Sequence, residues 1–281
     1  GEPVRLLSSG WDSTVFRVGS ELTFRFPRRA AVLPGLEREL SLLPLVAAHL
    51  ELSVPVPVHV CRGGEGFPWP FVGGPYLPGI ELADSRWAGP AAPNVAATVG
   101  AALARLHSPA LARALTRDGA PPVPVDPNQR CDPATLLPKV GATIQRLDGA
   151  GTWQPTHAVR NLFAQAQDLG PPSGPPVVTH GDLHVRHVLV EPEEPAVTGI
   201  VDWIDISLND PAVDLQLAWT AFDGEARDAF LDAYGPVDAE RELRARAVGL
   251  HLSTALLEYA VAESRPGLAA AARAGLERVA H

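Results

Sequence analysis

The stretch HGDLHVRHVLV, residues 180–190, decides the fold prediction for this chain of 281 residues. Its last three residues are apolar and favour a β-strand, and a charged turn that contains proline follows at 191–195. Residues 197–201, VTGIV, are typical of a return strand, which ends at Asp202. The pattern therefore predicts a short antiparallel hairpin, entered through a loop that is rich in histidine and carboxylate side chains.

A register centred on that turn places Val188 opposite Val201 and His187 opposite Asp202. Side chains directly opposite each other in such a pair have Cβ atoms about 5 Å apart, so one cation could contact both His187 and Asp202. Asp182 lies in the loop that leads into the hairpin. A carboxylate beside a cation site suits a group that accepts a proton while the cation neutralises phosphate charge.

The composition disfavours several classes of protein. The chain is 46% hydrophobic and 20% charged, which is typical of a globular protein with a substantial core. A net charge of −9 disfavours binding to nucleic acid or to an anionic membrane surface. No apolar run reaches the roughly 18 residues that cross a bilayer. Cys61 and Cys131 are the only cysteines, so we expect no disulfide framework, no thiolate zinc site and a cytoplasmic location.

The first part of the chain, residues 1–76, is predicted to be a small sheet-rich unit. Residues 14–18 and 22–26 alternate and carry β-branched and aromatic side chains, which predicts two strands joined by a Gly-Ser turn. Residues 63–79 are dense in glycine and proline and are interpreted as a turn and a linker, with a hinge near 73–79.

Helical patterns dominate the rest of the chain. A helix is expected to begin near Pro34, and Pro44 is expected to kink or interrupt it. The larger unit, 77–281, is predicted to be mostly helical. Its long helical patterns lie at 213–222, 225–234, 238–263 and 268–280. The fold class is therefore α+β, with two lobes.

Three motifs together resemble the kinase-like antibiotic phosphotransferases, the family of the aminoglycoside and macrolide phosphotransferases. They are His180-x-Asp182 with His187 five residues on, Val201-Asp202-Trp203, and Asp210-Pro211-x-x-Asp214. The resemblance implies a two-lobe fold similar to that of protein kinases. It implies that Asp182 is the catalytic aspartate, that His187 stands where most members have a metal-binding Asn, and that Asp202 is the second metal ligand.

The N-terminal part carries the same resemblance. Leu22-Thr23-Phe24-Arg25-Phe26-Pro27 is similar to the family strand whose cation holds the nucleotide phosphates, and Glu39 is similar to the helix glutamate that pairs with it. Lys139 is the only lysine, which agrees with an arginine in that place. By resemblance, Ser9, Gly10 and Ser13 belong to a phosphate-covering loop. Residues 70–77 stand where the hinge would hold the nucleobase.

The resemblance implies a small-molecule kinase that transfers the γ-phosphoryl group of ATP or GTP, with Mg²⁺, to a hydroxyl of an aminoglycoside- or macrolide-like acceptor. The histidine at position 187 favours the macrolide branch, whereas the net charge suits a cationic aminosugar. Asp205, Glu258 and Glu263 could line a pocket for a cationic substrate, but we interpret them as surface acids. The sequence leaves the acceptor and the oligomeric state open.

Two alternatives of other classes stay open. A catalytically silent kinase-like binding protein is one, because position 187 departs from the family pattern and Gly10 is the only glycine of the covering loop. A zinc hydrolase that uses His180, Asp182 and His184 is the other, since such clusters also bind zinc. We expect instead that His180 and His184 hold the loop by hydrogen bonds.

Overall fold

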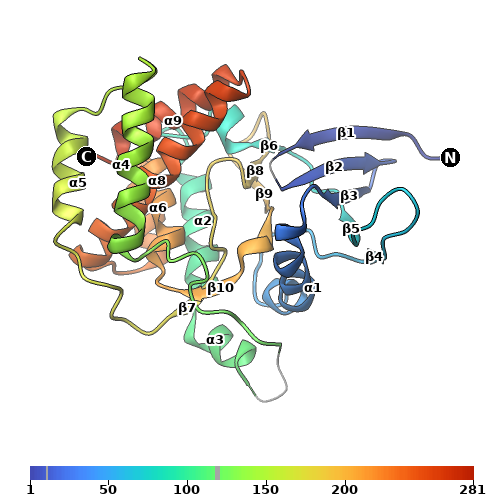
Figure 1. Cartoon of the computed structure of the whole chain (residues 1–281). Helices are drawn as coiled ribbons and strands as arrows, with labels where there is room; N and C mark the ends of the chain where they lie inside the picture. The colour runs from blue at the N-terminus through green and yellow to red at the C-terminus, as the bar shows by residue number, and fades with distance from the viewer. Residues whose placement is uncertain (11, 118–120) are drawn as a thin grey trace.

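A computed structural model describes residues 1–10, 12–117 and 121–281. Figure 1 shows the antiparallel sheet and one helix of the N-terminal part at the right, and a larger group of helices at the left. The α+β class expected from the sequence is confirmed. Among the described residues, every helix falls short of the length or the apolarity that a membrane crossing needs.

The N-terminal sheet is fully antiparallel, in the order β1-β2-β3-β5-β4. Its strands are β1 (Val4–Ser9), β2 (Ser13–Val18), β3 (Leu22–Pro27), β4 (His59–Cys61) and β5 (Phe71–Pro75). The predicted hairpin of β2 and β3 is confirmed, and Gly19 takes a positive φ of 63° in the turn between them. Directly opposite residues share a face, so Val15 and Arg25 lie on one face of the sheet.

The interpretation of residues 63–79 as a turn and linker is wrong for β5, which lies inside the sheet between β3 and β4. Phe71 stacks on Phe26 with ring centroids 4.4 Å apart. A Cβ on Gly73 would lie 2.5 Å from the ring of Phe24, so glycine lets the strand pass close to that ring. Here the glycines serve close packing, whereas the sequence pattern alone favours a loop.

Helix α1 (Leu33–Ala47) begins beside Pro34 as predicted and follows a short turn, η1 (Ala30–Val32). Pro44 lies inside the helix, so the predicted interruption is wrong, whereas the kink predicted as the other outcome stays a prediction. The helix buries an apolar stripe of Leu36, Leu42, Leu43 and Val46. These contacts outweigh the one backbone hydrogen bond that a proline removes.

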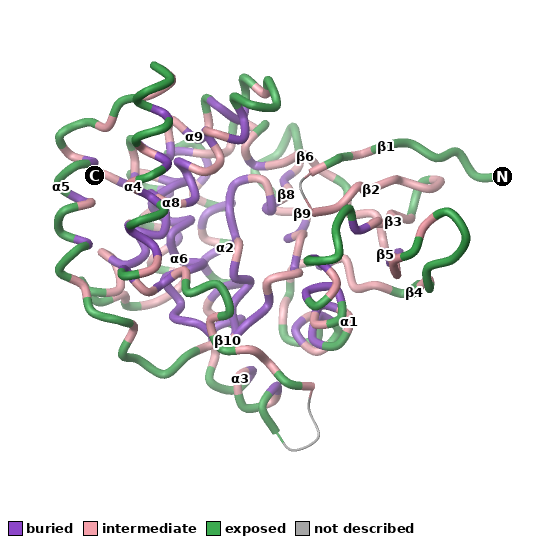
Figure 2. Tube along the Cα trace, in the orientation of Figure 1, coloured by how far each residue is buried: buried purple, intermediate pink, exposed green. Residues whose placement is uncertain are grey.

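The remainder of the chain is mostly helical, and the core lies among its helices, as Figure 2 shows. The helices are α2 (Pro93–Leu106), α3 (Pro109–Leu115), α4 (Pro133–Gly149), α5 (His157–Ala166), α6 (Ala212–Thr220), α7 (Gly224–Tyr234), α8 (Ala239–Ala262) and α9 (Pro266–Arg278). Helix α8 packs against α4, α5, α6 and α9.

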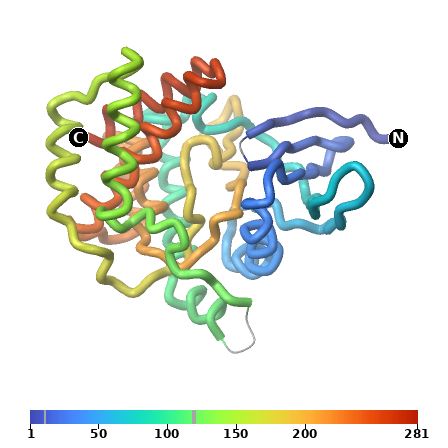
Figure 3. Tube along the Cα trace, viewed as in Figure 1, coloured from blue at the N-terminus to red at the C-terminus, as the bar shows by residue number. Residues whose placement is uncertain are grey.

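Short strands lie on either side of the loop at residues 180–187 and form the hairpin that follows it. They are β6 (Ile80–Glu81), β7 (Val177–Thr179), β8 (Val188–Val190), β9 (Val197–Ile200) and β10 (Ser207–Asn209), with the turns η2 (Leu82–Asp84) and η3 (Trp203–Asp205). They form two small sheets, β10-β7 and β6-β8-β9. The yellow and orange part of the trace in Figure 3 brings this region beside α1, which η3 contacts.

The predicted hairpin of β8 and β9 is present, but its register differs from the prediction by one residue. Val188 lies opposite Ile200, not opposite Val201. Nearer the turn the difference is two residues, because Val190 pairs with Val197 instead of Gly199, and a one-residue register shift between Leu189 and Val190 reduces it to one. A bulge of this kind adds a residue to one strand without a partner on the other.

A one-residue slip turns side chains to the opposite face of a regular strand. Asp202 nevertheless contacts His187, with its Oδ2 atom 3.4 Å from the Nε2 atom of the imidazole. The backbone of Asp202 is left-handed, with φ 67° and ψ 61°, and therefore leaves the strand direction at once. The pair was predicted correctly, although the register that led to the prediction was wrong.

Candidate active site

Asp182 lies in a loop between β7 and β8, and the side chain of Asp214 fixes this loop by hydrogen bonds to its backbone. The backbone amides of His180 and Gly181 donate to the two carboxylate oxygens of Asp214, at 2.7 and 3.0 Å. Asp214 is fully buried on α6, and the imidazole of His107 contacts it at 3.2 Å. Gly181 has a φ of 87°, and a Cβ there would lie 2.4 Å from the carbonyl oxygen of Asp205. Sharp geometry and charged hydrogen bonds thus fix the loop.

The carboxylate of Asp182 is half-buried, with 25% of the side chain exposed, and faces two cationic or imidazole groups. Its Oδ1 atom lies 3.1 Å from Nη1 of Arg130, and its Oδ2 atom lies 3.9 Å from Nε2 of His184. Burial raises the pKa of Asp182 to about 6, although Arg130 and His187 lower it. The group is therefore mostly ionised at pH 7 and close to the range in which general bases act.

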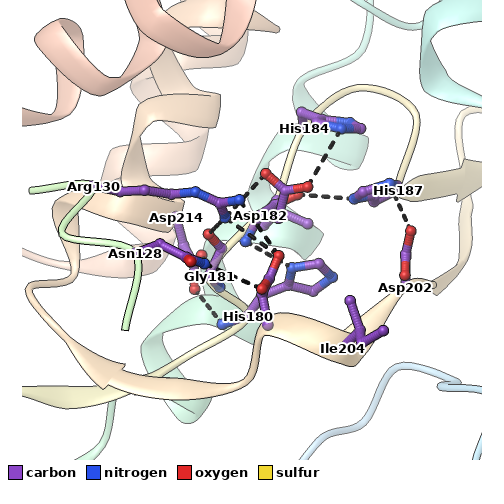
Figure 4. A network of polar contacts seen from close by, with 12 residues as sticks. Asn128, Arg130, His180, Gly181, Asp182, His184, His187, Asp202, Ile204 and Asp214 are labelled. Carbon is purple, nitrogen blue, oxygen red and sulfur yellow. Dashed lines mark hydrogen bonds and ion pairs between the residues drawn. The ribbon is translucent and has the colours of Figure 1, made fainter. Parts of the chain in front are cut away.

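His187 is oriented so that one ring nitrogen faces Asp202. Its Nδ1 atom lies 2.8 Å from the carbonyl oxygen of Asp182, which can only accept, so Nδ1 carries the proton in the neutral ring. The Nε2 atom then presents a lone pair toward Asp202, 3.4 Å away. A lone pair and a carboxylate at that distance repel each other unless a proton or a cation lies between them. Figure 4 shows both groups pointing at one another.

Arg25 connects the N-terminal sheet to this group. Its Nη2 atom makes a short ion pair with Glu39 on α1, and its Nη1 atom lies 3.4 Å from Oδ1 of Asp202. Burial alone would lower the pKa of Arg25, but the charges of Glu39 and Asp202 raise it above its ordinary value. Burial likewise opposes ionisation of Asp202, yet His187 and Arg25 hold its pKa below the ordinary value.

Ser9 ends β1, Ser13 begins β2, and Gly10 lies in the connection between them, of which Trp11 is outside the described residues. The amide of Gly10 donates to the carbonyl oxygen of Ser13 at 3.0 Å, which closes a tight turn. Arg28 donates to the carbonyl oxygen of Gly10 at 2.5 Å and to Ser9 Oγ at 3.3 Å. In the described part of the chain, the hydrogen bonds of Ser9, Gly10 and Ser13 that involve a side chain reach neither Asp182 nor Asp202.

His180 and His184 use their ring nitrogens within the loop, as the sequence predicts. His180 accepts from the amide of Asp182 at Nδ1 (3.3 Å) and therefore donates from Nε2 to the carbonyl oxygen of Val201 (3.0 Å). His184 accepts from the amide of Arg186 at Nδ1 (3.3 Å), which leaves its proton on Nε2. In that tautomer, neither ring has a lone pair to offer to a metal.

A second arrangement of metal-capable groups overlaps the first. Ligand atoms of Asp182, His184 and His187 all lie within 4.8 Å of one another. The hydrogen bond that His184 accepts opposes its use as a ligand, whereas His187 and Asp202 have no such conflict. Of these groups, His187 and Asp202 are therefore the two that could hold a divalent cation with their present hydrogen bonds intact. Imidazole is a poorer partner for Mg²⁺ than an oxygen ligand is, so the oxygen of Asp202 matters most for that ion.

Sequence reasoning missed Arg130, Asn128 and the role of Asp205. Arg130 lies in the loop before α4; it donates to the carbonyl oxygen of Gly181 and lies 3.4 Å from Oδ2 of Asp205. Asn128 donates to Oδ1 of Asp205 at 3.2 Å. The only signal in the sequence is a polar cluster, PNQRCD, within a proline-rich loop, and this cluster does not reveal which segment it contacts.

The chain matches the model of the phosphotransferase enzyme family, APH, over residues 3–246. It is 44% identical over 55 residues to the protein YcbJ of Bacillus subtilis (strain 168), named uncharacterized, and this match covers 20% of the chain and only 17% of YcbJ.

Solved structures are similar over almost the whole chain. The GDP complex of wild-type aminoglycoside 2'-phosphotransferase-IIIa is 22% identical with a TM-score of 0.68, and the match covers 99% of this chain and 92% of that one. Apoenzyme macrolide 2'-phosphotransferase MphH from Brachybacterium faecium is 25% identical with a TM-score of 0.58, covering 97% and 91%. The family match and these folds lead to one conclusion: the chain belongs to the phosphotransferase enzyme family and has its kinase-like fold.

Proposed function

We propose that the chain transfers the γ-phosphoryl group of ATP or GTP to a hydroxyl of a small-molecule acceptor of the aminoglycoside or macrolide kind. One observation carries the proposal: Arg25, Asp202 and His187 form a continuous line of contacts, and Asp182 accepts the hydrogen bond of His187 through its carbonyl oxygen. This order supports the proposal, because the reaction would use a phosphate-binding, a cation-binding and a proton-accepting group in that sequence.

Each residue has a distinct role in this proposal. Arg25, placed by its ion pair with Glu39, holds the α- and β-phosphates. His187 and Asp202 bind the cation, proposed to be Mg²⁺, which when bound neutralises phosphate charge. Asp182 orients the acceptor hydroxyl and takes its proton, and its pKa near 6 keeps it ionised for that task. Ser9, Gly10 and Ser13 cover the phosphates from the turn between β1 and β2.

Residues 1–76 act as the nucleotide-binding lobe and 77–281 as the catalytic and acceptor-binding lobe. We propose a cytoplasmic location, where nucleoside triphosphate is supplied, and the two free cysteines are compatible with a reducing compartment. Structures of relatives were solved with GDP and kanamycin, which supports a nucleotide and a small hydroxylated acceptor as partners.

The test compares the wild type with Asp182→Asn in an assay of nucleoside diphosphate release against hydroxylated antibiotics, with ATP and with GTP. We expect Asp182→Asn to lose at least 100-fold in kcat, because general base catalysis contributes roughly 10²–10⁴-fold. Its affinity for nucleotide, measured by calorimetry, should stay within threefold of the wild type. Asp168→Asn, an exposed carboxylate, is the matched control. Turnover of Asp182→Asn at the wild-type rate would contradict the assignment.

The same assay separates the two alternatives. A silent binding protein would bind nucleotide but show no diphosphate release that Asp182→Asn abolishes. A zinc hydrolase would hold zinc in the purified protein, as measured by elemental analysis, and would act without nucleotide. The tautomers of His180 and His184 count against the hydrolase, since both rings are already engaged by backbone groups.

A further inference from the structure

The acids near Asp182 are already paired with arginine. Asp205 lies 3.4 Å from Arg130 and 4.0 Å from Arg38, and it also accepts from Asn128. Arg130 spans Asp182 and Asp205, with Nη1 3.1 Å from the first carboxylate and Nη2 3.4 Å from the second. Figure 4 shows the guanidinium inserted at the edge of the Asp182 carboxylate. A ligand that approaches Asp182 therefore meets a cation beside it.

The neighbouring helices α4 and α8 offer no excess of negative charge either. Glu258 on α8 is held by Arg146 on α4 through two hydrogen bonds of 2.6 and 3.0 Å. His251 lies two helical turns before Glu258 on α8, and its buried Nδ1 atom lacks a hydrogen-bond partner in the described structure. Burial lowers the pKa of His251 to about 4, and the charges of Arg130 and Lys139 lower it further in the same direction. His251 is therefore neutral, and the fixed charges that act on it are positive.

This charge arrangement is unfavourable for a ligand with several ammonium groups. An ammonium that leaves water needs a carboxylate or several acceptors in exchange. At a separation of about 5 Å and a protein-like dielectric, repulsion by one guanidinium is worth on the order of 100-fold in binding, and here it offsets the attraction that the paired carboxylates of Asp182 and Asp205 would otherwise exert on an ammonium. The net charge of −9 does not alter this, because the long-range attraction of exposed carboxylates is screened by salt.

We propose that Arg130 selects the acceptor by charge, so that this enzyme phosphorylates a neutral or acidic alcohol, or one with a single amine, and not a polyamino sugar. The inference rests on the proposed function and narrows its acceptor class. Arg130 acts as a specificity and positioning residue: it holds Asp182 and Asp205 in place and cancels the attraction of their carboxylates for ammonium groups near the alcohol that Asp182 would activate.

The first test is a panel of acceptors grouped by charge, with wild-type enzyme at physiological ionic strength. Kanamycin and gentamicin form the polycationic group, and a macrolide with one amine, neutral sugars and hydroxy acids form the others. We expect kcat/KM for the best member of the other groups to exceed that for kanamycin at least 100-fold. A polyamino sugar that is the best acceptor in the panel overturns the proposal and leaves the phosphotransferase function intact.

The second test changes the charge itself. In Arg130→Gln, the ratio of kcat/KM for kanamycin to that for the best other acceptor should rise at least tenfold. Arg160→Gln removes the same charge from an exposed site on α5 and should leave the ratio unchanged. A merely structural Arg130 would lower both activities and leave the ratio as it was, which would refute the proposal.

An inactive wild type and an unfolded Arg130→Gln variant are distinguished from failure of the charge selection. If the wild type phosphorylates nothing and releases no diphosphate, the proposed function fails; the same ratio, taken from dissociation constants measured by calorimetry, then still decides the charge selection. If Arg130→Gln does not fold, judged by its unfolding transition, the wild-type panel decides alone. Kanamycin binding more tightly than the uncharged acceptors would again contradict the proposal.

Discussion

Gly181→Ala is the substitution whose effect the structure specifies best. Gly181 has a φ of 87°, where an L-residue costs roughly 1 kcal/mol. The new Cβ would lie 2.4 Å from the carbonyl oxygen of Asp205, so backbone must move, at roughly 1–3 kcal/mol for a forced shift in packed surroundings. The loop cannot yield freely, because the amide of Gly181 donates to Asp214 and its carbonyl oxygen accepts from Arg130. We expect the free energy of unfolding to fall by about 2–4 kcal/mol.

The activity should fall more than the stability. Asp182 is the next residue, so a shift of the loop moves its carboxylate against the other groups of the site. A displacement of about 1 Å can cost 10²-fold in rate, and we expect a loss of that order in kcat. Urea unfolding and diphosphate release measure the two effects on the same preparation.

The control is Gly141→Ala in α4, where the new Cβ would meet only the ring of Phe163, at an ordinary 3.7 Å. In a helix interior the same substitution should stabilise by about 0.5–1 kcal/mol. Gly181→Ala with unchanged stability and wild-type kcat would refute the argument that the left-handed backbone positions Asp182.

Three further predictions concern buried polar groups. Asp214→Asn keeps one acceptor oxygen for two amide donors, so the free energy of unfolding should fall by about 2–4 kcal/mol in urea titrations. Burial lowers the pKa of His251 to about 4, so the unfolded chain takes up the proton more readily than the folded one. The contribution of this neutral ring to the free energy of unfolding, about 3 kcal/mol, is present above pH 6.5 and is lost as the pH falls toward 4. His251→Gln should therefore flatten the loss of stability measured between pH 6.5 and 4.5. Burial raises the pKa of the Cys131 thiol well above its ordinary value, so a thiol reagent at pH 8 should label Cys61 in the native protein and label Cys131 only after unfolding.

The parts of the site that are near in sequence, or follow a strand pattern, could be predicted. The alternation in 14–18 and 22–26 gave the hairpin that carries Arg25, and the apolar run after His187 gave the strand that leads back to Asp202. Both follow from a periodicity of two, which is a local property of the chain. The contact between Arg25 and Glu39 was expected only from resemblance, and the structure brings the two side chains together.

The errors share a physical cause. Glycine in 63–79 favours turns in an isolated peptide, but Gly73 is required by the ring of Phe24 on the adjacent strand. Pro44 disfavours a helix locally, but the buried leucines around it outweigh that cost. In each case a contact between distant segments overrides a local preference, and a sequence pattern contains no term for such contacts.

Arg130 is the extreme case of the same limit. It is one of 22 arginines, lies in an irregular loop, and contacts a residue 51 positions away. Nothing in its neighbourhood distinguishes it from an arginine exposed to solvent. In the folded chain, the half-buried guanidinium of Arg130 lies next to the proposed base. It therefore alters the local charge that an acceptor meets, and it lowers the pKa of Asp182. The chemistry of Asp182 is thus readable from a short motif, whereas the choice of acceptor depends on a loop whose position only the folded chain determines.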